Sequence, residues 1–377
     1  MKDLCANALL SLVMGLGLAV GVCRGPVVAQ PAPAATDSIG AALAGEHPGG
    51  AVIGLLHDDG TSVRSFGAVD STGTAPTART LFEIGSITKT FTGLLLADRI
   101  ERGQLRPETP VTQLLPDSVT ITRADSVGDT PMTLAHLATH RSGLPRLPAN
   151  LKDVMPSRQD PYAAYGDSAL HAFLDDYTLP RTPGATYQYS NLGMGLLGHL
   201  LARRADTTYG ALVRRRITGP LGLSDTRLRL TDDQEERFAQ GHDRLGFRVP
   251  PWHFEALAGA GALRSTAADM LDYLQAHRRA LRTDPDTASA LGRAMQSPLA
   301  PRASAGSDGT RIGFGWHETT RDGHRMVVHT GGTGGFKSIA LLDRATGHGA
   351  VILINAALAS KRVAEAGFAL IEALRSD

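Results

Sequence analysis

The chain has 377 residues, of which 42% are hydrophobic and 20% charged, with 38 Lys and Arg against 37 Asp and Glu. This composition is typical of a globular protein and excludes a chain that is disordered throughout. The net charge of +1 excludes the clustered basic excess that nucleic-acid binding requires. At roughly 150 residues per domain, the length predicts about two domains or one bilobed domain.

The first 29 residues are typical of a secretory signal peptide. An uncharged stretch at 5–22 follows Lys2, and Val27-Val28-Ala29 ends in the small residue that a signal peptidase requires. The stretch is short for a membrane span, and a retained N-terminal anchor is the alternative. Cleavage after Ala29 would remove Cys5 and Cys23, the two cysteines of the chain, and with them all thiol chemistry. We therefore expect a periplasmic or secreted protein with no stable membrane span after cleavage.

A Pro/Ala-rich tether is predicted at 30–36, followed by a single catalytic domain at 37–377. A short helix is expected at 37–46. Two strands, at 51–56 and 62–69, flank Asp58-Asp59-Gly60, which is the pattern of a β-hairpin. Near the other end of the chain, strands are predicted at 325–330, 338–343 and 348–355, and a helix at 361–376.

The middle of the chain is mostly helical in pattern, with helices predicted at 86–102, 133–140, 167–176, 191–204, 209–217 and 266–277. Strands at both ends and helices between them predict an α/β (α+β) fold, in which both chain ends build one antiparallel sheet. We place the α/β lobe at about 37–95 and 306–377, and an inserted helical lobe at about 96–305. A cleft between two such lobes is a common place for an active site.

The segment 82–89 places Ser86 and Lys89 three residues apart at the start of a helix, which puts a hydroxyl and an amine on one face. The helix dipole and the apolar neighbours both lower the pKa of the Lys89 amine, so that it can accept the Ser86 proton. The Ser86 N–H can form half of an oxyanion hole. The alternative is that Ser86 is an ordinary helix N-cap.

Tyr189-Ser190-Asn191 opens another predicted helix. In the functional interpretation, the Tyr189 phenol lies near Lys89 and relays a proton to a leaving group. Asn191 then orients Lys89 or a substrate amide through its side chain. In the alternative interpretation, the segment is a loop in which Asn191 is the helix N-cap.

The segment 329–336 begins with His329, Thr330, Gly331 and Gly332 on a predicted strand edge. Its glycines would allow a ligand to approach the strand backbone. The alternative is a glycine-rich hairpin turn. No Gly-Lys-Ser or Gly-Lys-Thr follows, which argues against a phosphate-binding loop.

Together, these segments resemble the three motifs of the serine β-lactamase and penicillin-binding-protein superfamily. The motifs are Ser86-x-x-Lys89, Tyr189-x-Asn191 and His329-Thr330-Gly331. The segments 82–89 and 333–336 are similar to class C β-lactamases, and 140–145 and 220–225 are also similar to segments of the superfamily. The resemblance extends from about Ser38 to the C-terminus.

The resemblance implies a serine hydrolase in which Ser86 forms an acyl-enzyme, with no metal or organic cofactor. Lys89 and Tyr189 would share the base and acid roles, and which of them takes the first proton stays open. Asn191 would orient the site. The substrate would be a β-lactam, which implies antibiotic resistance, or a peptidoglycan-derived peptide, and we expect a monomer.

On the opposite wall, the resemblance implies that His329 and Thr330 bind a carboxylate and that the Gly332 N–H completes the oxyanion hole with that of Ser86. Class C β-lactamases have Lys where this chain has His329, whereas His-Thr-Gly is similar to class C-related D-alanyl-D-alanine peptidases. A neutral imidazole attracts a carboxylate less than an ammonium does. We therefore favour a class C-like β-lactamase, with a D-alanyl-D-alanine carboxypeptidase/endopeptidase and a β-lactamase-fold carboxylesterase as alternatives. A penicillin sensor or scaffold without turnover is the non-enzymatic alternative.

Two further patterns are weaker evidence of a functional site. His136 and His140 have the i, i+4 spacing of metal ligands, but Leu137 stands where a zinc protease would have Glu. A core or capping role is the favoured interpretation of this pair. The basic run 214–216 is expected to be a solvated helix face.

Overall fold

The computed structural model describes residues 34–45, 49–125 and 127–376. The predicted signal peptide at 1–29 lies outside the described residues, as does most of the predicted tether. Helix α1, Ala34–Ala44, begins three residues before the predicted start, so 34–36 are helical and do not belong to a tether. Alanine favours a helix, and Asp37 lies in the first turn, where the helix dipole stabilises a negative charge.

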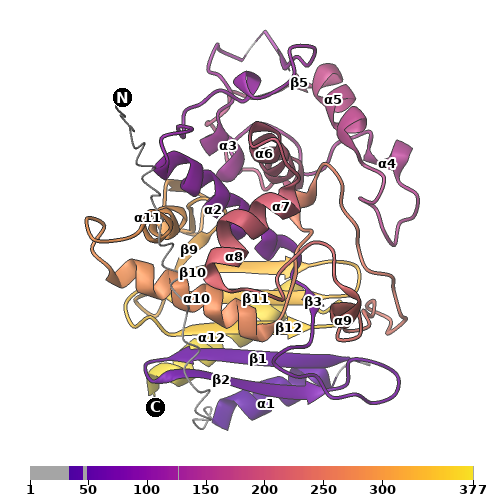
Figure 1. Cartoon of the computed structure of the whole chain (residues 1–377), viewed down its shortest axis with the longest axis vertical. Helices are drawn as coiled ribbons and strands as arrows, with labels where there is room; N and C mark the ends of the chain where they lie inside the picture. The colour runs from indigo at the N-terminus through magenta and orange to yellow at the C-terminus, as the bar shows by residue number, and fades with distance from the viewer. Residues whose placement is uncertain (1–33, 46–48, 126, 377) are drawn as a thin grey trace, which may run out of the picture.

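The core of the molecule is an eight-stranded antiparallel sheet in the order β2-β1-β12-β11-β10-β9-β8-β7 (Figure 1). Its strands are β1 (Gly50–His57), β2 (Gly60–Gly67), β7 (Ala303–Ser304), β8 (Arg311–Ile312), β9 (His317–Arg321), β10 (His324–Gly332), β11 (Lys337–Asp343) and β12 (Gly349–Ile354). Strand β1 pairs with β12, with Ala51 opposite Ile354. The two ends of the chain therefore build one sheet, as the alternation of the sequence predicts.

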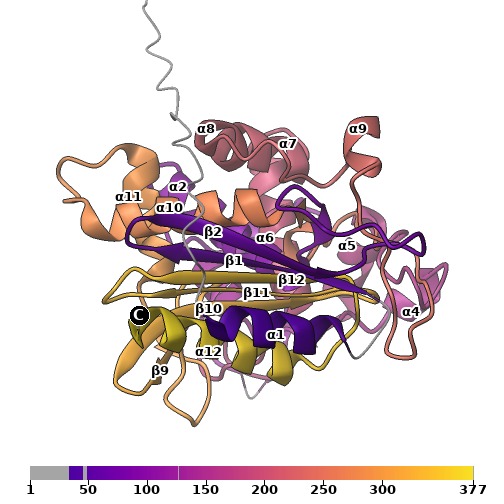
Figure 2. The same cartoon turned by 90° about the horizontal axis from the view of Figure 1, so that it is seen from below.

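Helices cover both faces of the sheet (Figure 2). Helices α1 and α12 (Ser360–Ser376) lie on one face, and the apolar side chains Ile53, Ile339 and Ile352 are buried between them and the sheet. Helix α10 (Ala267–Arg282) lies on the other face and packs against β1 and β12. This helix falls within the predicted helical lobe at 96–305, but it packs on the sheet because its apolar side is buried there.

The remaining elements form the inserted, mostly helical region. Its helices are α2 (Thr88–Glu101), α3 (Leu134–Ala138), α4 (Leu151–Val154), α5 (Asp167–Asp176), α6 (Asn191–Arg204), α7 (Tyr209–Val213), α8 (Gly219–Leu221), α9 (Asp232–Glu235) and α11 (Ala290–Gln296). Short strands pair as β3 (Phe82–Glu83) with β6 (Arg264–Ser265) and as β4 (Thr122–Arg123) with β5 (Thr178–Leu179). Helices α5 and α6 have the predicted bounds. Helix α7 ends earlier than predicted, in a π-helical turn at Arg214–Thr218.

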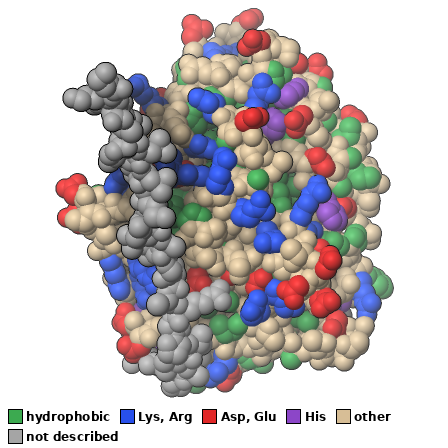
Figure 3. All heavy atoms as spheres, in the orientation of Figure 1, with side chains coloured by type: hydrophobic (Ala, Val, Ile, Leu, Met, Phe, Trp, Pro, Cys, Tyr) green, Lys and Arg blue, Asp and Glu red, His purple; other side chains and the backbone are tan. Residues whose placement is uncertain are grey.

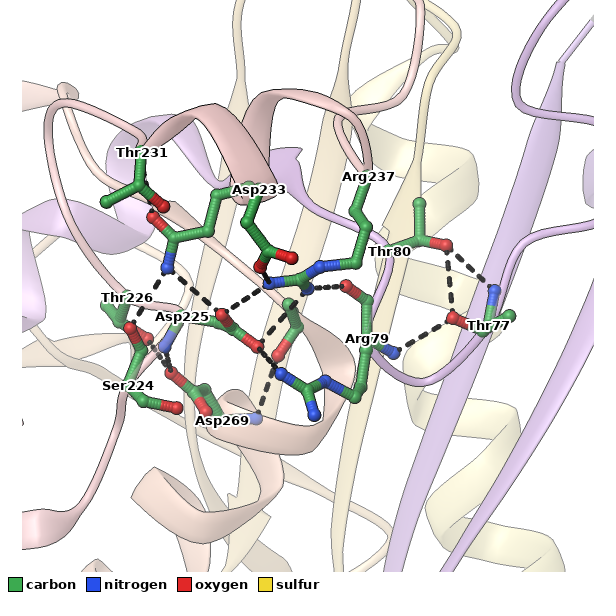
Figure 4. Close-up of polar contacts among 12 residues, drawn as sticks. Thr77, Arg79, Thr80, Ser224, Asp225, Thr226, Thr231, Asp233, Arg237 and Asp269 are labelled. Carbon is green, nitrogen blue, oxygen red and sulfur yellow. Dashed lines mark hydrogen bonds and ion pairs between the residues drawn. The ribbon is translucent and has the colours of Figure 1, made fainter.

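The segment 220–225 ends in a polar network that joins four parts of the chain (Figure 4). The Asp225 carboxylate accepts hydrogen bonds from Arg237 at 2.8 Å and from Arg79 at 3.4 Å. The Asp225 N–H and the Thr226 hydroxyl donate to the Asp269 carboxylate, each over 2.8 Å. The network holds the loop before β3, the α9 segment and the start of α10 together.

Acidic and basic side chains are interspersed over the face drawn in Figure 3, in keeping with the net charge of +1. Within the described ranges, no helix combines the length and the apolar character needed to cross a membrane.

Candidate active site

Ser86 lies in a 3-10 turn, Gly85–Ile87, between β3 and α2. Gly85 has a φ of +49°, a left-handed conformation that glycine adopts without a steric penalty. A Cβ at Gly85 would lie 2.5 Å from the Gly332 nitrogen, so strand β10 packs directly on this turn. Neither the turn nor α2 has a side-chain cap, so Ser86 is not the N-cap that the alternative interpretation requires.

The Lys89 amine is fully buried one helical turn after Ser86. Its Nζ lies 3.0 Å from Ser86 Oγ and donates to the Ala260 carbonyl oxygen over 2.6 Å. Burial lowers the pKa of Lys89 well below its ordinary value of 10.5, and the positive charge of Arg146 lowers it further. A neutral amine has a lone pair, so this arrangement can accept the Ser86 proton.

The Tyr189 phenol completes a three-residue cluster with Ser86 and Lys89. It hydrogen-bonds with Ser86, and its ring centroid lies 5.0 Å from Lys89 Nζ. Burial raises the pKa of Tyr189 to about 12, although the Ser86 hydrogen bond opposes the shift. At neutral pH the group is therefore a protonated phenol, which can donate a proton.

Asn191 is the first residue of α6, but the helix cap is Ser190, whose hydroxyl accepts from the Gly193 N–H over 2.8 Å. The N-cap alternative for Asn191 is therefore wrong. The Asn191 amide nitrogen donates to the Tyr162 hydroxyl over 3.3 Å, whereas its buried Oδ1 has no partner among the described residues. Among those residues, Lys89 Nζ bonds only to Ser86 and Ala260. Its predicted orientation by Asn191 is therefore not seen.

His329 lies on β10 and is buried. Its Nδ1–H donates to the Thr330 carbonyl oxygen over 2.7 Å, and its ring centroid lies 6.4 Å from that of Tyr189. Burial holds the pKa of His329 well below 6.5, and the neighbouring His317 and Lys89 add to the shift. The imidazole is therefore uncharged at neutral pH.

A cavity of about 450 Å³ opens over these groups. Of the predicted site residues, it is lined by Ser86, Tyr189, His329, Thr330, Gly331 and Gly332. Lys89 is buried behind Ser86, and Asn191 does not line the cavity. The structure thus brings three segments that are far apart in the sequence to one cleft.

Comparison with known proteins places this arrangement in a family. The family model described as Beta-lactamase matches residues 36–374. The chain belongs to the β-lactamase family. The family and its relatives identify the protein as a serine hydrolase of the β-lactamase/DD-peptidase superfamily.

The β-lactamase of Escherichia coli (strain K12) is 30% identical over 206 residues, which cover 54% of this chain and 50% of that protein. The match thus spans about half of that relative's length. The D-alanyl-D-alanine-carboxypeptidase/endopeptidase AmpH of the same organism is 28% identical over 295 residues, which cover 74% of this chain and 72% of AmpH. In fold, the crystal structure of a β-lactamase from Sulfitobacter sp. EE-36 matches with a TM-score of 0.76 and 23% identity, over 91% of this chain and 97% of that one. The predicted fold class is confirmed.

The structure of this β-lactamase-family protein adds four residues that sequence reasoning did not place in the site. Arg146, His317 and Lys337 line the cleft, and His140 lies beneath it. The His140 Nδ1 accepts from the Ser190 N–H over 3.1 Å, and its ring centroid lies 4.4 Å from that of Tyr189, so it supports the Tyr189 loop. Their positions could have indicated them. His140 and Arg146 lie within or directly after the segment 140–145, and Lys337 directly follows 333–336. His317 lies on β9, next to β10.

The other histidine of the i, i+4 pair, His136, has a different role. His136 Nδ1 accepts from the Thr133 N–H over 3.3 Å at the start of α3. This is the capping role that the sequence favoured over metal binding.

Proposed function

We propose that this protein is an exported hydrolase that forms an acyl-enzyme on Ser86 with β-lactams, in the manner of a class C-like β-lactamase. The observation that carries the proposal is the 3.0 Å contact between Ser86 Oγ and the buried Lys89 amine, whose pKa is well below its ordinary value, with the Tyr189 phenol on the same hydroxyl. Export rests on the signal-like segment at 1–29.

In the acylation step, Lys89 takes the Ser86 proton as the hydroxyl oxygen attacks the substrate carbonyl carbon. The negative charge that develops on the carbonyl oxygen is bound by the N–H groups of Ser86 and Gly332, and each such donor contributes about 2.7–4 kcal/mol. The C–N bond then breaks, and the Tyr189 phenol donates its proton to the departing nitrogen. The proton on Lys89 restores the phenol.

In the deacylation step, water attacks the ester carbonyl and loses a proton to the same pair of residues. Ser86 leaves as a hydroxyl, and a carboxylic acid is released. The speed of this step separates a β-lactamase from a peptidase that penicillin traps.

A D-alanyl-D-alanine carboxypeptidase/endopeptidase is the second candidate. Two observations favour it: the neutral imidazole at His329 and the relative AmpH, which aligns with 74% of this chain. A carboxylesterase and a sensor without turnover are further outcomes of the experiment below.

The experiment mixes the mature protein with a penicillin, a chromogenic cephalosporin, a D-Ala-D-Ala peptide and a short-chain ester, and follows intact mass and product. A β-lactamase gives transient adducts and rapid loss of the cephalosporin. Persistent penicillin adducts with peptide cleavage indicate a peptidase, turnover of the ester alone indicates an esterase, and stable adducts without turnover indicate a sensor.

The matched control is Ser86→Ala, in which we expect no adduct because the attacking oxygen is gone. An adduct of undiminished yield on this variant would contradict the assignment of the nucleophile.

A further inference from the structure

The cleft carries more positive charge than the molecule as a whole. Its lining includes two basic side chains, Arg146 and Lys337, and no Asp or Glu among the described residues. Its two histidines add no charge at neutral pH, because burial lowers the pKa of His317 to about 4 and that of His329 well below 6.5. A cleft of one sign concentrates ligands of the opposite sign.

Lys337 lines the cleft next to Gly332, one of the two proposed oxyanion donors. It is the first residue of β11 and stands directly opposite Gly332 in the antiparallel register. A Cβ built on Gly332 would lie 2.5 Å from Lys337 Nζ, so the ammonium lies over the glycine and a side chain there would displace it. Gly332 itself packs against the turn that carries Ser86.

The Lys337 ammonium has no anionic partner among the described residues. Its one hydrogen bond there goes to the Ser360 hydroxyl over 3.3 Å, which leaves donors free. Burial lowers the pKa of Lys337, and the charge of Arg244 lowers it further. A half-buried cation next to another cation gains most from an anion, because the anion offsets both the desolvation and the repulsion.

Arg146, unlike Lys337, lies close to the proposed base and acid, Lys89 and Tyr189. Its guanidinium lies 5.0 Å from the centroid of the Tyr189 ring, and its charge lowers the pKa values of Lys89 and Tyr189. A change at Arg146 would therefore affect charged and uncharged substrates alike. Lys337 is hydrogen-bonded to Ser360 and not to Lys89 or Tyr189, so its charge can act on the substrate.

We propose that the Lys337 ammonium, held over Gly332 and bonded to Ser360, binds the carboxylate of the substrate and makes the enzyme prefer anionic over neutral acyl donors. Lys337 thereby supplies the positive charge that the uncharged His329 lacks. This inference rests on the proposed function of the cleft.

The test compares two thioester substrates that differ at one end, where one has a free carboxylate and the other its methyl amide. Charge-assisted hydrogen bonds are worth about 1.5–3 kcal/mol. Lys337→Met should therefore lower kcat/KM for the free carboxylate about 10- to 100-fold, mainly through KM. The methyl amide should change by less than about twofold, which also shows that the variant is folded. Lys337→Arg should keep most of the preference.

Lys361→Met is the matched control, because Lys361 follows Ser360 directly, is exposed and does not line the cleft. It removes the same charge, and we expect no change in the preference. Equal losses on both substrates in Lys337→Met, or no loss on either, would overturn the role of Lys337 while leaving the hydrolase intact. If the wild-type protein cleaves neither substrate and forms no adduct, the proposed function itself is wrong, and this inference with it.

Discussion

Lys89 shows how removal from water changes the chemistry of one side chain. An exposed lysine is charged at neutral pH and cannot act as a base. In this protein the amine is fully buried between the Ser86 hydroxyl and the Ala260 carbonyl, and no ion pair joins it to a carboxylate of the described residues. Lys89 Nζ donates to the Ala260 carbonyl oxygen, and a neutral amine at the same place can accept the proton of the Ser86 hydroxyl.

We expect Lys89→Met to lower the rate of Ser86 acylation by about 10²–10⁴-fold, the usual effect of losing a general base. Lys89→Arg should be equally impaired, because guanidinium keeps its proton and cannot accept another. Single-turnover mass spectrometry measures the rate. Substantial rescue by arginine would show that the positive charge matters rather than the lone pair.

The pH dependence of acylation follows from the same shift. Because the pKa of Lys89 lies well below 10.5, the neutral amine forms at a lower pH than in an exposed lysine, and activity should fall as the pH is lowered through its pKa. In a plot of kcat/KM against pH, this acid limb should be absent from the residual activity of Lys89→Met. An acid limb that persists unchanged in the variant would assign it to another group.

At the scale of elements, the position of Ser86 depends on hydrogen bonds between segments outside the cleft. The Asp225 network ties the loop before β3 to the α9 segment and to α10, which packs on the sheet. Strand β3 leads directly into the turn that carries Ser86, so a well-fixed loop also fixes the nucleophile.

Asp225→Asn should destabilise the fold by about 1–3 kcal/mol, because the Arg237 guanidinium and the Gln234 amide lose a buried charged acceptor. Arg79→Met should cost less than about 1 kcal/mol, since the Arg79 side chain is 62% exposed and water screens its ion pair. Urea unfolding measures both changes. Equal effects of the two substitutions would show that the buried Arg237 bonds are not the dominant contribution.

For the whole molecule, Glu83 is a point where distant segments meet. The Trp252 N–H donates to Glu83 Oε1 over 2.6 Å, Arg264 lies 4.0 Å away, and Thr333 of the glycine-rich turn lowers the pKa of the same carboxyl. Burial raises the pKa of Glu83 from 4.5 to about 7, against the opposing effect of these contacts. The folded protein therefore binds this proton more tightly than the unfolded chain does.

This shift predicts a pH-dependent free energy of unfolding. The contribution from Glu83 should be fully present below pH 4.5 and should be lost as the pH rises through about 7. It amounts to about 3 kcal/mol at most. In urea titrations, the stability of the wild type relative to Glu83→Gln should fall over this interval. A difference that stays constant with pH, or that grows as the pH rises, would contradict the raised pKa.

Much of the fold was open to prediction because its signals are local. The bounds of α5 and α6 and the strands at both chain ends follow from hydrophobic periodicity and turn residues, which act within a few residues. The segments that resemble the superfamily motifs also identified Ser86, Lys89 and Tyr189 as site residues. Long-range packing decided what local signals did not: α10 lies on the sheet although its position in the sequence suggested the helical lobe. Ser190 rather than Asn191 caps α6, so the alternative interpretation of Asn191 was wrong.

The sequence by itself determined the order of the elements, the antiparallel sheet from both chain ends and the Ser86 and Lys89 spacing, because each depends on backbone geometry and nearby residues. Only the tertiary structure decided the charges in the cleft. The lowered pKa values of Lys89 and His329, and the position of Lys337 over Gly332, arise from burial and neighbours on other strands and helices. Desolvation and electrostatic interactions depend on distance in space, which spacing along the chain does not specify.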